Sequence, residues 1–324
     1  MQHIFQKFSD LKVLIIGDVM MDTYLWGRVD RISPEAPVPV VSVTKKENRL
    51  GGAANVALNV QSLGAQPIIC AVIGNDQEGI DFLNLLEQQQ LSVEGILKID
   101  GRPTTVKTRV IGHNQQIVRV DAETDQLISE EANELIFSKI QDIIDREKID
   151  AVIFEDYDKG LLSEQLITRT VELANNRQIL TVVDPKKRNF LSYRNVSLFK
   201  PNLKELREGL KMEIEPRRLE NISDAVKMLQ KKLQSKMVMV TLSELGVYIN
   251  SPDGEKILPA HIRTIADVSG AGDTVIATAT LCLAAGLDSF KTAEIANLAG
   301  GLVCEQVGVV PINYNLLLSE ALSL

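Results

Sequence analysis

The feature of this sequence that most restricts its fold is a series of short, almost continuously apolar runs separated by longer amphipathic segments. Runs of this length that are rich in β-branched residues are typical of strands buried on both faces. They lie at 13–17, 67–74, 151–156, 179–184 and 237–242. Strands that alternate with helices in this way form a parallel sheet covered by helices. We therefore predict an α/β fold.

The segments between these runs carry the signals of helices. One begins at Ser129, a favourable N-cap, and ends in basic residues that suit the helix dipole. Another ends at Gly64, a typical helix-terminating residue. The predicted helices span 52–64, 129–148, 164–176, 223–234, 273–285 and 292–304.

Two segments depart from this alternation. Residues 36–45 alternate between apolar and polar side chains and are interrupted by prolines, and residues 104–121 have the pattern of two alternating strands around Gly112-His113-Asn114. Half-polar strands do not fit the middle of a parallel sheet buried on both faces. We predict that they form a small separate sheet, a lid or a dimer clasp. The lid strands are expected at about 24–48 and 102–121.

Composition and charge exclude several classes of protein. The chain has 324 residues, 45% of them hydrophobic, which is enough to bury a large core, and we expect one domain over residues 1–324. The net charge is −8 and there is no basic block, so we expect no nucleic-acid or membrane binding. A small anionic substrate needs only a local positive site and is not excluded.

The cysteines and the N-terminus predict the compartment. Cys70, Cys282 and Cys304 are widely spaced, and we interpret them as free thiols in a reducing environment. The sequence has neither a signal-peptide pattern nor a long apolar span. We therefore expect a cytoplasmic protein.

The strongest chemical signal is the segment Asp267-Val268-Ser269-Gly270-Ala271-Gly272-Asp273-Thr274, which directly precedes an apolar helix. Glycines at a helix start leave backbone N–H groups free, and together with the helix dipole they form a site for an anion. A carboxylate there would repel phosphate if it were only a cap. As a general base, Asp273 would take the proton from an attacking hydroxyl. Spacing alone leaves an ordinary helix cap as an equal alternative.

Two weaker clusters lie nearer the N-terminus. Gly51-Gly52-Ala53-Ala54-Asn55 would let the backbone approach a ligand closely, although such a turn is more often only tight packing. It is neither a Walker A motif nor G-x-G-x-x-G. Asp18 and Asp22 follow the first strand, where carboxylates suit sugar hydroxyls, unless they are solvated loop acids.

Together these motifs resemble those of the ribokinase-like carbohydrate kinase family. The segment 267–274 is similar to the family's C-terminal signature, residues 51–55 to its G-G-x-x-x-N run, and Asn202 with Glu205 to its N-x-x-E element. This ordered agreement favours the catalytic role of Asp273 over the cap. The resemblance implies a three-layer sandwich with a mainly parallel central sheet and a small β lid. It also implies a kinase that uses ATP and Mg²⁺, and it allows K⁺ as a further cofactor.

A narrower resemblance is to the kinases that phosphorylate D-glycero-D-manno-heptose 7-phosphate at C1. It rests on residues 17–22, 31–40, 49–57, 109–116, 156–160 and 184–186. In many bacteria such kinases form the N-terminal half of a bifunctional protein with a nucleotidyltransferase domain. This sequence has no such second half and no H-x-G-H motif, so we expect adenylyl transfer to need another protein. Asp158 stands where a small residue is usual and places a negative charge near the expected sugar phosphate.

The resemblance implies a role for each matching residue. Asp273 resembles the catalytic base, and the N–H groups of Gly270, Ala271 and Gly272 resemble the anion hole. The positions that resemble sugar-binding residues are Asp18, Asp22, Gly51, Gly52 and Asn55. The positions that resemble the nucleotide and Mg²⁺-phosphate site are Asn202, Glu205, Thr241, Ser243, Gly246 and Asn297.

The resemblance also implies sites for cations and for a second phosphate. Glu205 is expected to bind Mg²⁺ through water, and Asp267 to help hold a monovalent cation. A phosphorylated sugar needs positive groups for its distal phosphate. The candidates are Lys107, Arg109, Lys159 and Lys186, each of which is otherwise a solvated surface residue.

These interpretations predict an ATP-dependent kinase that forms heptose 1,7-bisphosphate for ADP-heptose and lipopolysaccharide core synthesis. The nearest alternative is a kinase of the same fold for another sugar, such as a fructose phosphate, ribose or a nucleoside. An alternative of another class is a non-catalytic sugar-binding regulator. An oxidoreductase is not expected, because no G-x-G-x-x-G follows the first strand. The lid strands predict a homodimer, since such edges need a cover, from a second chain or from the body of the same chain.

Overall fold

The computed structural model describes residues 1–112, 115–261 and 263–324. The turn expected around Gly112-His113-Asn114 therefore lies partly outside the described residues. Among the helices that are described, none combines the length and the apolar character needed to cross a membrane.

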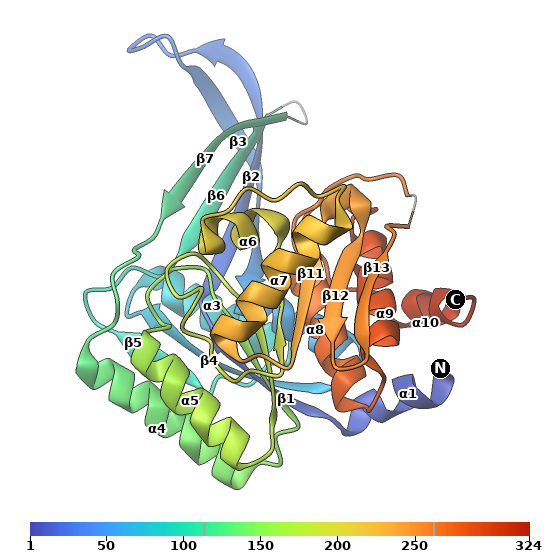
Figure 1. Ribbon diagram of the computed structural model, residues 1–324. Coiled ribbons are helices and arrows are strands. Elements are labelled where there is room, and N and C mark those ends of the chain that lie inside the picture. The colour runs from blue at the N-terminus through green and yellow to red at the C-terminus, as the bar shows by residue number, and fades with distance from the viewer. Residues whose placement is uncertain (113–114, 262) are drawn as a thin grey trace.

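The body of the molecule is built around one large, mostly parallel sheet (Figure 1). Over the described ranges its nine strands run in the order β13-β12-β11-β10-β9-β8-β1-β4-β5, and the β11/β12 and β12/β13 pairs are antiparallel. The strands are β1 (Lys12–Gly17), β4 (Gln66–Gly74), β5 (Ile96–Ile99), β8 (Ala151–Glu155), β9 (Leu180–Asp184), β10 (Leu198–Phe199), β11 (Met237–Thr241), β12 (Val247–Ser251) and β13 (Gly254–Leu258). All five apolar runs lie in this sheet, which confirms the predicted fold class.

Alternate residues of the strands face two separate apolar cores, which explains why the strands have continuous apolar sequences. In β1, Val13 and Ile15 face one core, and Leu14 and Ile16 face the other. The first core is covered by α1 (Gln2–Gln6), α2 (Ala53–Ser62), α3 (Gln77–Gln88), α8 (Ala271–Ala284), α9 (Ser289–Val303) and α10 (Tyr314–Ala321). The second is covered by α4 (Glu130–Arg146), α5 (Glu164–Asn176), α6 (Leu203–Leu210) and α7 (Leu219–Leu233). The result is three layers.

The predicted helix signals act as expected. The Ser129 hydroxyl accepts a hydrogen bond from the backbone N–H of Ala132 at 3.2 Å, and Gly64, with φ +97°, follows the end of α2. Helix α9 begins at Ser289, ahead of the predicted start at 292, because the Asp288 carboxylate accepts the Lys291 N–H and caps it. Helices α1, α3, α6 and α10 and strands β5, β10, β12 and β13 were not predicted.

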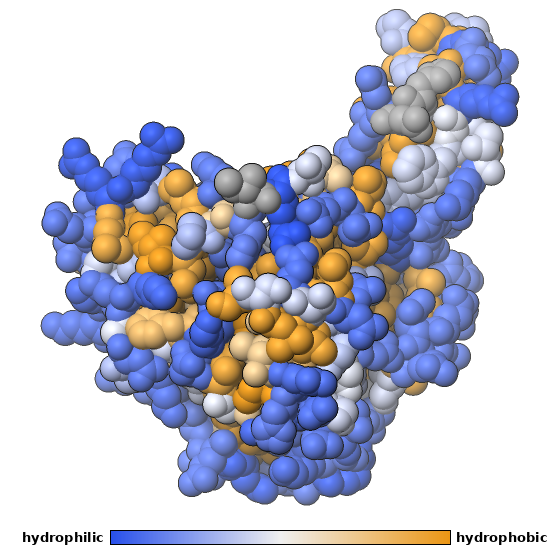
Figure 2. All heavy atoms as spheres, turned by 90° about the vertical axis from the view of Figure 1, so that its right-hand side faces the viewer, coloured by the Kyte–Doolittle hydropathy of each residue, from blue (hydrophilic) through white to orange (hydrophobic). Residues whose placement is uncertain are grey.

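A second, four-stranded sheet projects from the body, and we call it the lid sheet (Figures 1 and 2). Its strand order is β3-β2-β6-β7. The strands are β2 (Val19–Ile32), β3 (Pro39–Gly52), β6 (Val106–Gly112) and β7 (Gln115–Ala122). Two antiparallel hairpins are joined through the parallel pair β2/β6. This sheet confirms the predicted small β lid.

The lid strands begin deeper in the molecule than expected. Strand β2 starts at Val19, where Val19, Met20 and Met21 are buried against the body. Strand β3 ends at Gly51 and Gly52, so the glycine pair is the foot of a lid strand that leads directly into α2. The foot of the lid therefore lies in the same place as the glycine and acidic clusters of the sequence.

Candidate active site

The glycine turn before α8 lies where two cavities meet. Gly270 has φ +79°, which favours glycine, and a Cβ atom there would lie 3.1 Å from Asn55 Nδ2. Ser269 and Gly270 line the smaller cavity, whereas Ala271 and Gly272 line the larger one. The positive end of the α8 dipole thus stands between the cavities. Of the N–H groups expected to form the anion hole, that of Ala271 donates to the Val268 carbonyl at 3.3 Å.

The smaller cavity has a volume of about 120 Å³ and combines the foot of the lid with the start of α8. It is lined by Met20, Asp22, Gly51, Gly52, Lys107, Arg109, Tyr157, Ser269, Gly270, Asp273 and Val309. Most of the residues predicted to bind the sugar are therefore brought together. Within the described ranges, the predicted residues that do not line this cavity are Asp18, Asn55, Lys159 and Lys186.

Asp273 is almost fully buried and is held by two hydrogen bonds. The side-chain amide of Asn55 donates to Asp273 Oδ2 at 2.7 Å, and the Tyr157 hydroxyl donates to Oδ1 at 3.0 Å. Burial raises the pKa of Asp273 to about 6, and these two bonds oppose the rise. A carboxylate with this pKa is ionised at neutral pH and can accept a proton from a hydroxyl.

The structure does not support the alternative role of Asp273 as a helix cap. The N-cap of α8 is Gly270, and the Asp273 carboxylate makes no capping bond among the described residues. Asn55, which is expected to contact the sugar, donates a hydrogen bond to Asp273, and Asn59, one turn further along α2, accepts the Thr274 hydroxyl at 2.9 Å. Through these two hydrogen bonds, helix α2 fixes the start of α8.

Charged side chains at the foot of the lid face one another across paired strands. Asp22 of β2 is opposite Lys107 of β6, and it forms an ion pair with Arg109. A Cβ atom on Gly51 would lie only 2.4 Å from Asp22 Oδ2, so the glycine leaves the room that this carboxylate needs. The Arg109 guanidinium also lies 5.4 Å from the centre of the Tyr24 ring.

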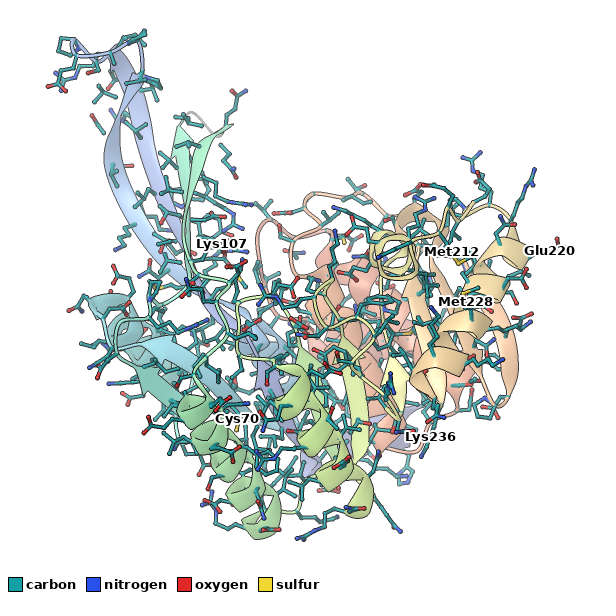
Figure 3. All side chains as sticks on the ribbon, turned by 60° about the vertical axis from the view of Figure 1, so that its left-hand side comes forward. Cys70, Lys107, Met212, Glu220, Met228 and Lys236 are labelled. Atoms are coloured by element: carbon teal, nitrogen blue, oxygen red, sulfur yellow. The ribbon has the colours of Figure 1, made fainter. Side chains whose placement is uncertain are left out.

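Lys107 differs from the other candidate cations because it has no salt-bridge partner among the described residues. It lies at the foot of the lid (Figure 3), half-buried, with Nζ 5.8 Å from the centre of the Tyr157 ring. Burial lowers the pKa of Lys107. By contrast, Lys159 Nζ pairs with Glu123 at 2.7 Å, and Lys186 Nζ with Glu205 at 2.6 Å.

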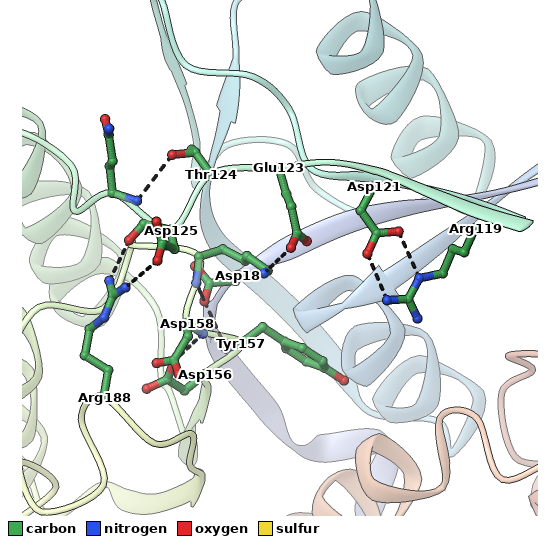
Figure 4. A network of polar contacts seen from close by, with 12 residues as sticks. Asp18, Arg119, Asp121, Glu123, Thr124, Asp125, Asp156, Tyr157, Asp158 and Arg188 are labelled. Carbon is green, nitrogen blue, oxygen red and sulfur yellow. Dashed lines mark hydrogen bonds and ion pairs between the residues drawn. The ribbon is translucent and has the colours of Figure 1, made fainter.

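Asp18 organises the loop that carries Tyr157 (Figure 4). Its carboxylate accepts the backbone N–H groups of Tyr157, Lys159 and Leu161 at 2.9, 3.0 and 3.3 Å. Asp158, within this loop, has φ +55°. Asp18 therefore acts on the cavity through the loop, while Asp22 lines the cavity itself.

The larger cavity has a volume of about 580 Å³ and lies on the other side of the glycine turn. The predicted nucleotide residues Thr241, Ser243, Gly246 and Asn297 all line it. Gly246 has φ +95°, and a Cβ atom there would lie 2.0 Å from the Leu258 carbonyl oxygen. The Asn297 side-chain amide donates to the Pro259 carbonyl at 2.8 Å. Described residues from three parts of the chain, within 241–247, 260–275 and 297–304, thus form one cavity large enough for a nucleotide.

Asn202 and Glu205 form a capping box at the start of α6. Asn202 Oδ1 accepts the Glu205 N–H, and Glu205 Oε2 accepts the Asn202 N–H, both at 2.8 Å. The other oxygen of Glu205 accepts Lys186 Nζ. Neither residue is among those that line the two cavities described.

The sequence reasoning missed a group of buried charges next to the glycine turn. Lys200 Nζ pairs with Asp184 Oδ2 at 2.7 Å, and a Cβ atom on Gly272 would lie within 3.8 Å of both groups. Glu155 is buried nearby with neither oxygen hydrogen-bonded in the described part of the chain. Burial, and then Asp184 and Asp273, raise the pKa of Glu155 well above its usual value. Asp184 is the last residue of the strand predicted at 179–184, and Glu155 is the penultimate residue of the one predicted at 151–156, so their places at strand ends were the available signal.

Asp267 connects the glycine turn to the loop that contains Gly308. Its carboxylate accepts the backbone N–H of Ser269 and of Gly308, both at 3.0 Å. These bonds, against the effect of burial, leave the pKa of Asp267 below its usual value. Its expected part in binding a monovalent cation remains a prediction.

Comparison with known proteins shows to which family the chain belongs. The model of the pfkB family carbohydrate kinases matches residues 10–313. The chain belongs to the pfkB family. It is therefore a carbohydrate kinase, a phosphotransferase with a hydroxyl acceptor, and membership implies the use of ATP.

Among the relatives of this pfkB kinase are bifunctional proteins. The chain is 40% identical to the bifunctional protein HldE of Helicobacter pylori strain HPAG1 over 299 residues, and 40% identical to that of Magnetococcus marinus over 310 residues. These matches cover 92% and 95% of this chain but 63% of each relative. The chain thus spans less than two thirds of the length of these relatives.

Solved structures share the fold of this pfkB kinase. Phosphofructokinase-2 from Escherichia coli in complex with potassium matches with a TM-score of 0.78 at 17% identity, over 97% of this chain and 98% of that one. Ribokinase from Arabidopsis thaliana, complexed with ribose and ATP, matches with a TM-score of 0.73 at 16% identity, over 96% and 98%. The ribokinase-like fold predicted from the sequence is confirmed.

Proposed function

We propose that this pfkB kinase transfers the γ-phosphoryl group of ATP to the C1 hydroxyl of D-glycero-D-manno-heptose 7-phosphate. The observation that carries the proposal is the position of Asp273 and the start of α8 between a nucleotide-sized cavity and a small, charged one. The motifs at residues 17–22, 31–40 and 156–160, and the similarity to the HldE proteins, support this choice of sugar.

The smaller cavity supplies groups for both ends of such a substrate. Asp22 offers a carboxylate to sugar hydroxyls, and Gly51 and Gly52 let the sugar approach the backbone. Lys107 offers an ammonium group that no carboxylate within the described ranges already pairs with. A phosphate would restore the favourable interaction that the half-buried charge has lost by burial. We therefore assign the distal phosphate to Lys107, with Arg109 beside it.

The reaction follows from the position of the base. Asp273 takes the proton of the C1 hydroxyl while the hydroxyl oxygen attacks the γ-phosphorus. The new P–O bond forms as the bond to the bridging oxygen of ADP breaks, and ADP leaves. The positive end of the α8 dipole stabilises the negative charge of the transferring group.

Mg²⁺ fits the residues present. Each oxygen of Glu205 accepts one hydrogen bond and keeps a lone pair for a water ligand of the ion. The described residues contain no cluster of three or more His, Cys, Asp or Glu side chains that would enclose a metal. When bound together with the nucleotide, Mg²⁺ would neutralise phosphate charge, and Glu205 would hold one of its water ligands. Chelation should abolish turnover, and Glu205→Gln should raise the half-saturating Mg²⁺ concentration about tenfold.

A panel of sugars tests the proposal. ADP release would be measured with heptose 7-phosphate, fructose 1-phosphate, fructose 6-phosphate, ribose and a nucleoside. We expect the heptose phosphate to give the highest kcat/KM. Strong turnover of an unphosphorylated sugar with none of the heptose phosphate would reject the proposed substrate in favour of another sugar. The absence of ADP release with every member would favour a non-catalytic regulator.

We also propose that residues 1–324 act as one kinase unit and that a second copy covers the lid sheet. The lid sheet exposes apolar side chains, more than a third of each being accessible, on β2, β3 and β7. They are Ile32, Val43, Ile117, Val118 and Val120. Light scattering should give the mass of a dimer, and Val43→Glu with Val120→Glu should give that of a monomer. A monomeric wild type would reject this part of the proposal.

A further inference from the structure

We propose that Tyr157 is a positioning residue that fixes the carboxylate of Asp273 and favours its ionised form. The proposal rests on the kinase activity of the family and not on the identity of the sugar. No sequence motif had given Tyr157 a role beyond the match at 156–160.

The two hydrogen bonds of Asp273 act on different oxygens. Because Tyr157 donates to Oδ1 and Asn55 donates to Oδ2, the plane of the carboxylate is fixed from two sides. A carboxylate has about four lone pairs, so each oxygen keeps one. Asp273 and Tyr157 both line the smaller cavity. The carboxylate can therefore accept a substrate hydroxyl without losing either fixing bond.

Tyr157 is itself held rigidly. Its backbone N–H donates to Asp18 Oδ2 at 2.9 Å, within the loop that this carboxylate organises. Its ring lies beside two ammonium groups, with Lys186 Nζ at 5.2 Å and Lys107 Nζ at 5.8 Å from the ring centre. Lys186 in turn pairs with Glu205. The phenol therefore connects the base to the lid on one side and to the capping box on the other.

The charges around Asp273 explain why a donor is needed there. On the strand ends beneath it lie Asp184, which raises the pKa of Asp273, and Lys200, which lowers it. The charge of Asp273 in turn raises the pKa of Glu155. Across the cavity lie the charged groups of the lid, which are Asp22, Lys107 and Arg109. Burial, followed by the charge of Asp273, raises the pKa of Tyr157 well above its usual value. Tyr157 therefore remains a hydrogen-bond donor and does not act as a base.

The decisive experiment is a titration of Asp273 that needs no substrate. The carboxyl groups would be labelled with ¹³C-aspartate and followed by NMR, and Asp273→Asn would assign the resonance. We expect the pKa of Asp273 in Tyr157→Phe to lie about 0.5 to 1 pH unit above that of the wild type, because a bond that favours the ion is lost. An unchanged titration would overturn the proposal.

A matched variant separates this effect from a general structural one. The buried Tyr193 hydroxyl donates to Asp156 Oδ2 at 2.7 Å, outside the cavity. Tyr193→Phe removes the same atom and should leave the titration of Asp273 unchanged. If Tyr157→Phe does not fold, 3-fluorotyrosine at position 157 provides a stronger donor and should lower the pKa of Asp273. A shift in the opposite direction, or none, would overturn the proposal.

Kinetics provide a second measurement with whichever sugar the panel identifies. Relative to the wild type, Tyr157→Phe should lose about two- to fivefold more kcat/KM at pH 6 than at pH 8.5. An equal loss at every pH would overturn the positioning role. If no sugar is phosphorylated, the proposed substrate fails while the NMR titration still decides the role of Tyr157.

Discussion

The two cavities that meet at the start of α8 are built from different kinds of residue. In the smaller one, charged and polar side chains hold one another, as in the pairs Arg109–Asp22 and Tyr157–Asp273. The wall of the larger one consists mainly of small and apolar residues and backbone, with Gly246, Gly300 and Val275 among them. The smaller cavity therefore arranges its groups before any ligand binds, whereas the larger one is suited to a ligand by its size and shape.

Under the function that we propose, chemistry and choice of sugar belong to the smaller cavity, and affinity for the nucleotide belongs to the larger one. Interactions between fixed polar groups are lost abruptly when one partner is removed. Contacts spread over an apolar wall are lost gradually. Substitutions in the smaller cavity should therefore have large and specific effects, and those in the larger cavity small effects confined to ATP.

The largest effect is expected for Asp273→Asn. The amide keeps the shape of the side chain but cannot accept the proton, so kcat should fall about 10²- to 10⁴-fold. Binding of ATP, measured by calorimetry, should stay within about threefold of the wild type. A near-normal kcat would mean that Asp273 is not the catalytic base.

The next effect is expected for Lys107→Gln. Loss of one charge-assisted bond to a phosphate should lower kcat/KM for the phosphorylated sugar about 10- to 100-fold. The control is Lys45→Gln, because Lys45 is an exposed lid lysine that pairs with Glu47 and does not line the cavity. If both variants behaved alike, Lys107 would not be the phosphate-binding group.

A smaller effect is expected from pH. Because the base must be ionised and the pKa of Asp273 is about 6, kcat/KM should be nearly constant above pH 7 and fall about fivefold between pH 6 and pH 5. The KM for ATP should change little over this range, since the larger cavity does not contain Asp273. A rate that rises on acidification would contradict the assignment.

The smallest effect is expected for Asn297→Ala in the larger cavity. It removes the bond to the Pro259 carbonyl and should raise the KM for ATP about two- to tenfold. The KM for the sugar and kcat should remain unchanged. If the KM for the sugar changed instead, the two cavities would not be independent.

The body of the fold could be predicted because strands buried on both faces leave a direct mark on the sequence. The lid sheet was predicted only in part, since β2 has two patterns, a buried foot at Val19–Met21 and an exposed upper part. An apolar segment followed by a polar one does not have the alternation by which such a strand is detected.

The candidate site, too, could be predicted from the sequence only in part. Asp273 could be predicted because its helix start, its glycines and its neighbours are local in sequence. Its contact with Tyr157 joins residues 116 positions apart, and the Lys200–Asp184 pair also depends on the packing of separate strands. Such contacts follow from tertiary structure and have no local sequence pattern.

The length of β2 makes the lid sheet a long arm that extends from its foot beside the candidate active site. Asp22 lies three residues from the start of β2 at Val19, roughly 10 Å along the strand, whereas Ile32 at its far end is roughly 40 Å away. Any rotation about the foot therefore moves the tip roughly four times as far as Asp22, and Lys107 travels with Asp22 because the two are paired. A large displacement of the tip would therefore leave the side chains of Asp22 and Lys107 close to the foot and to the cavity that they line together with Asp273.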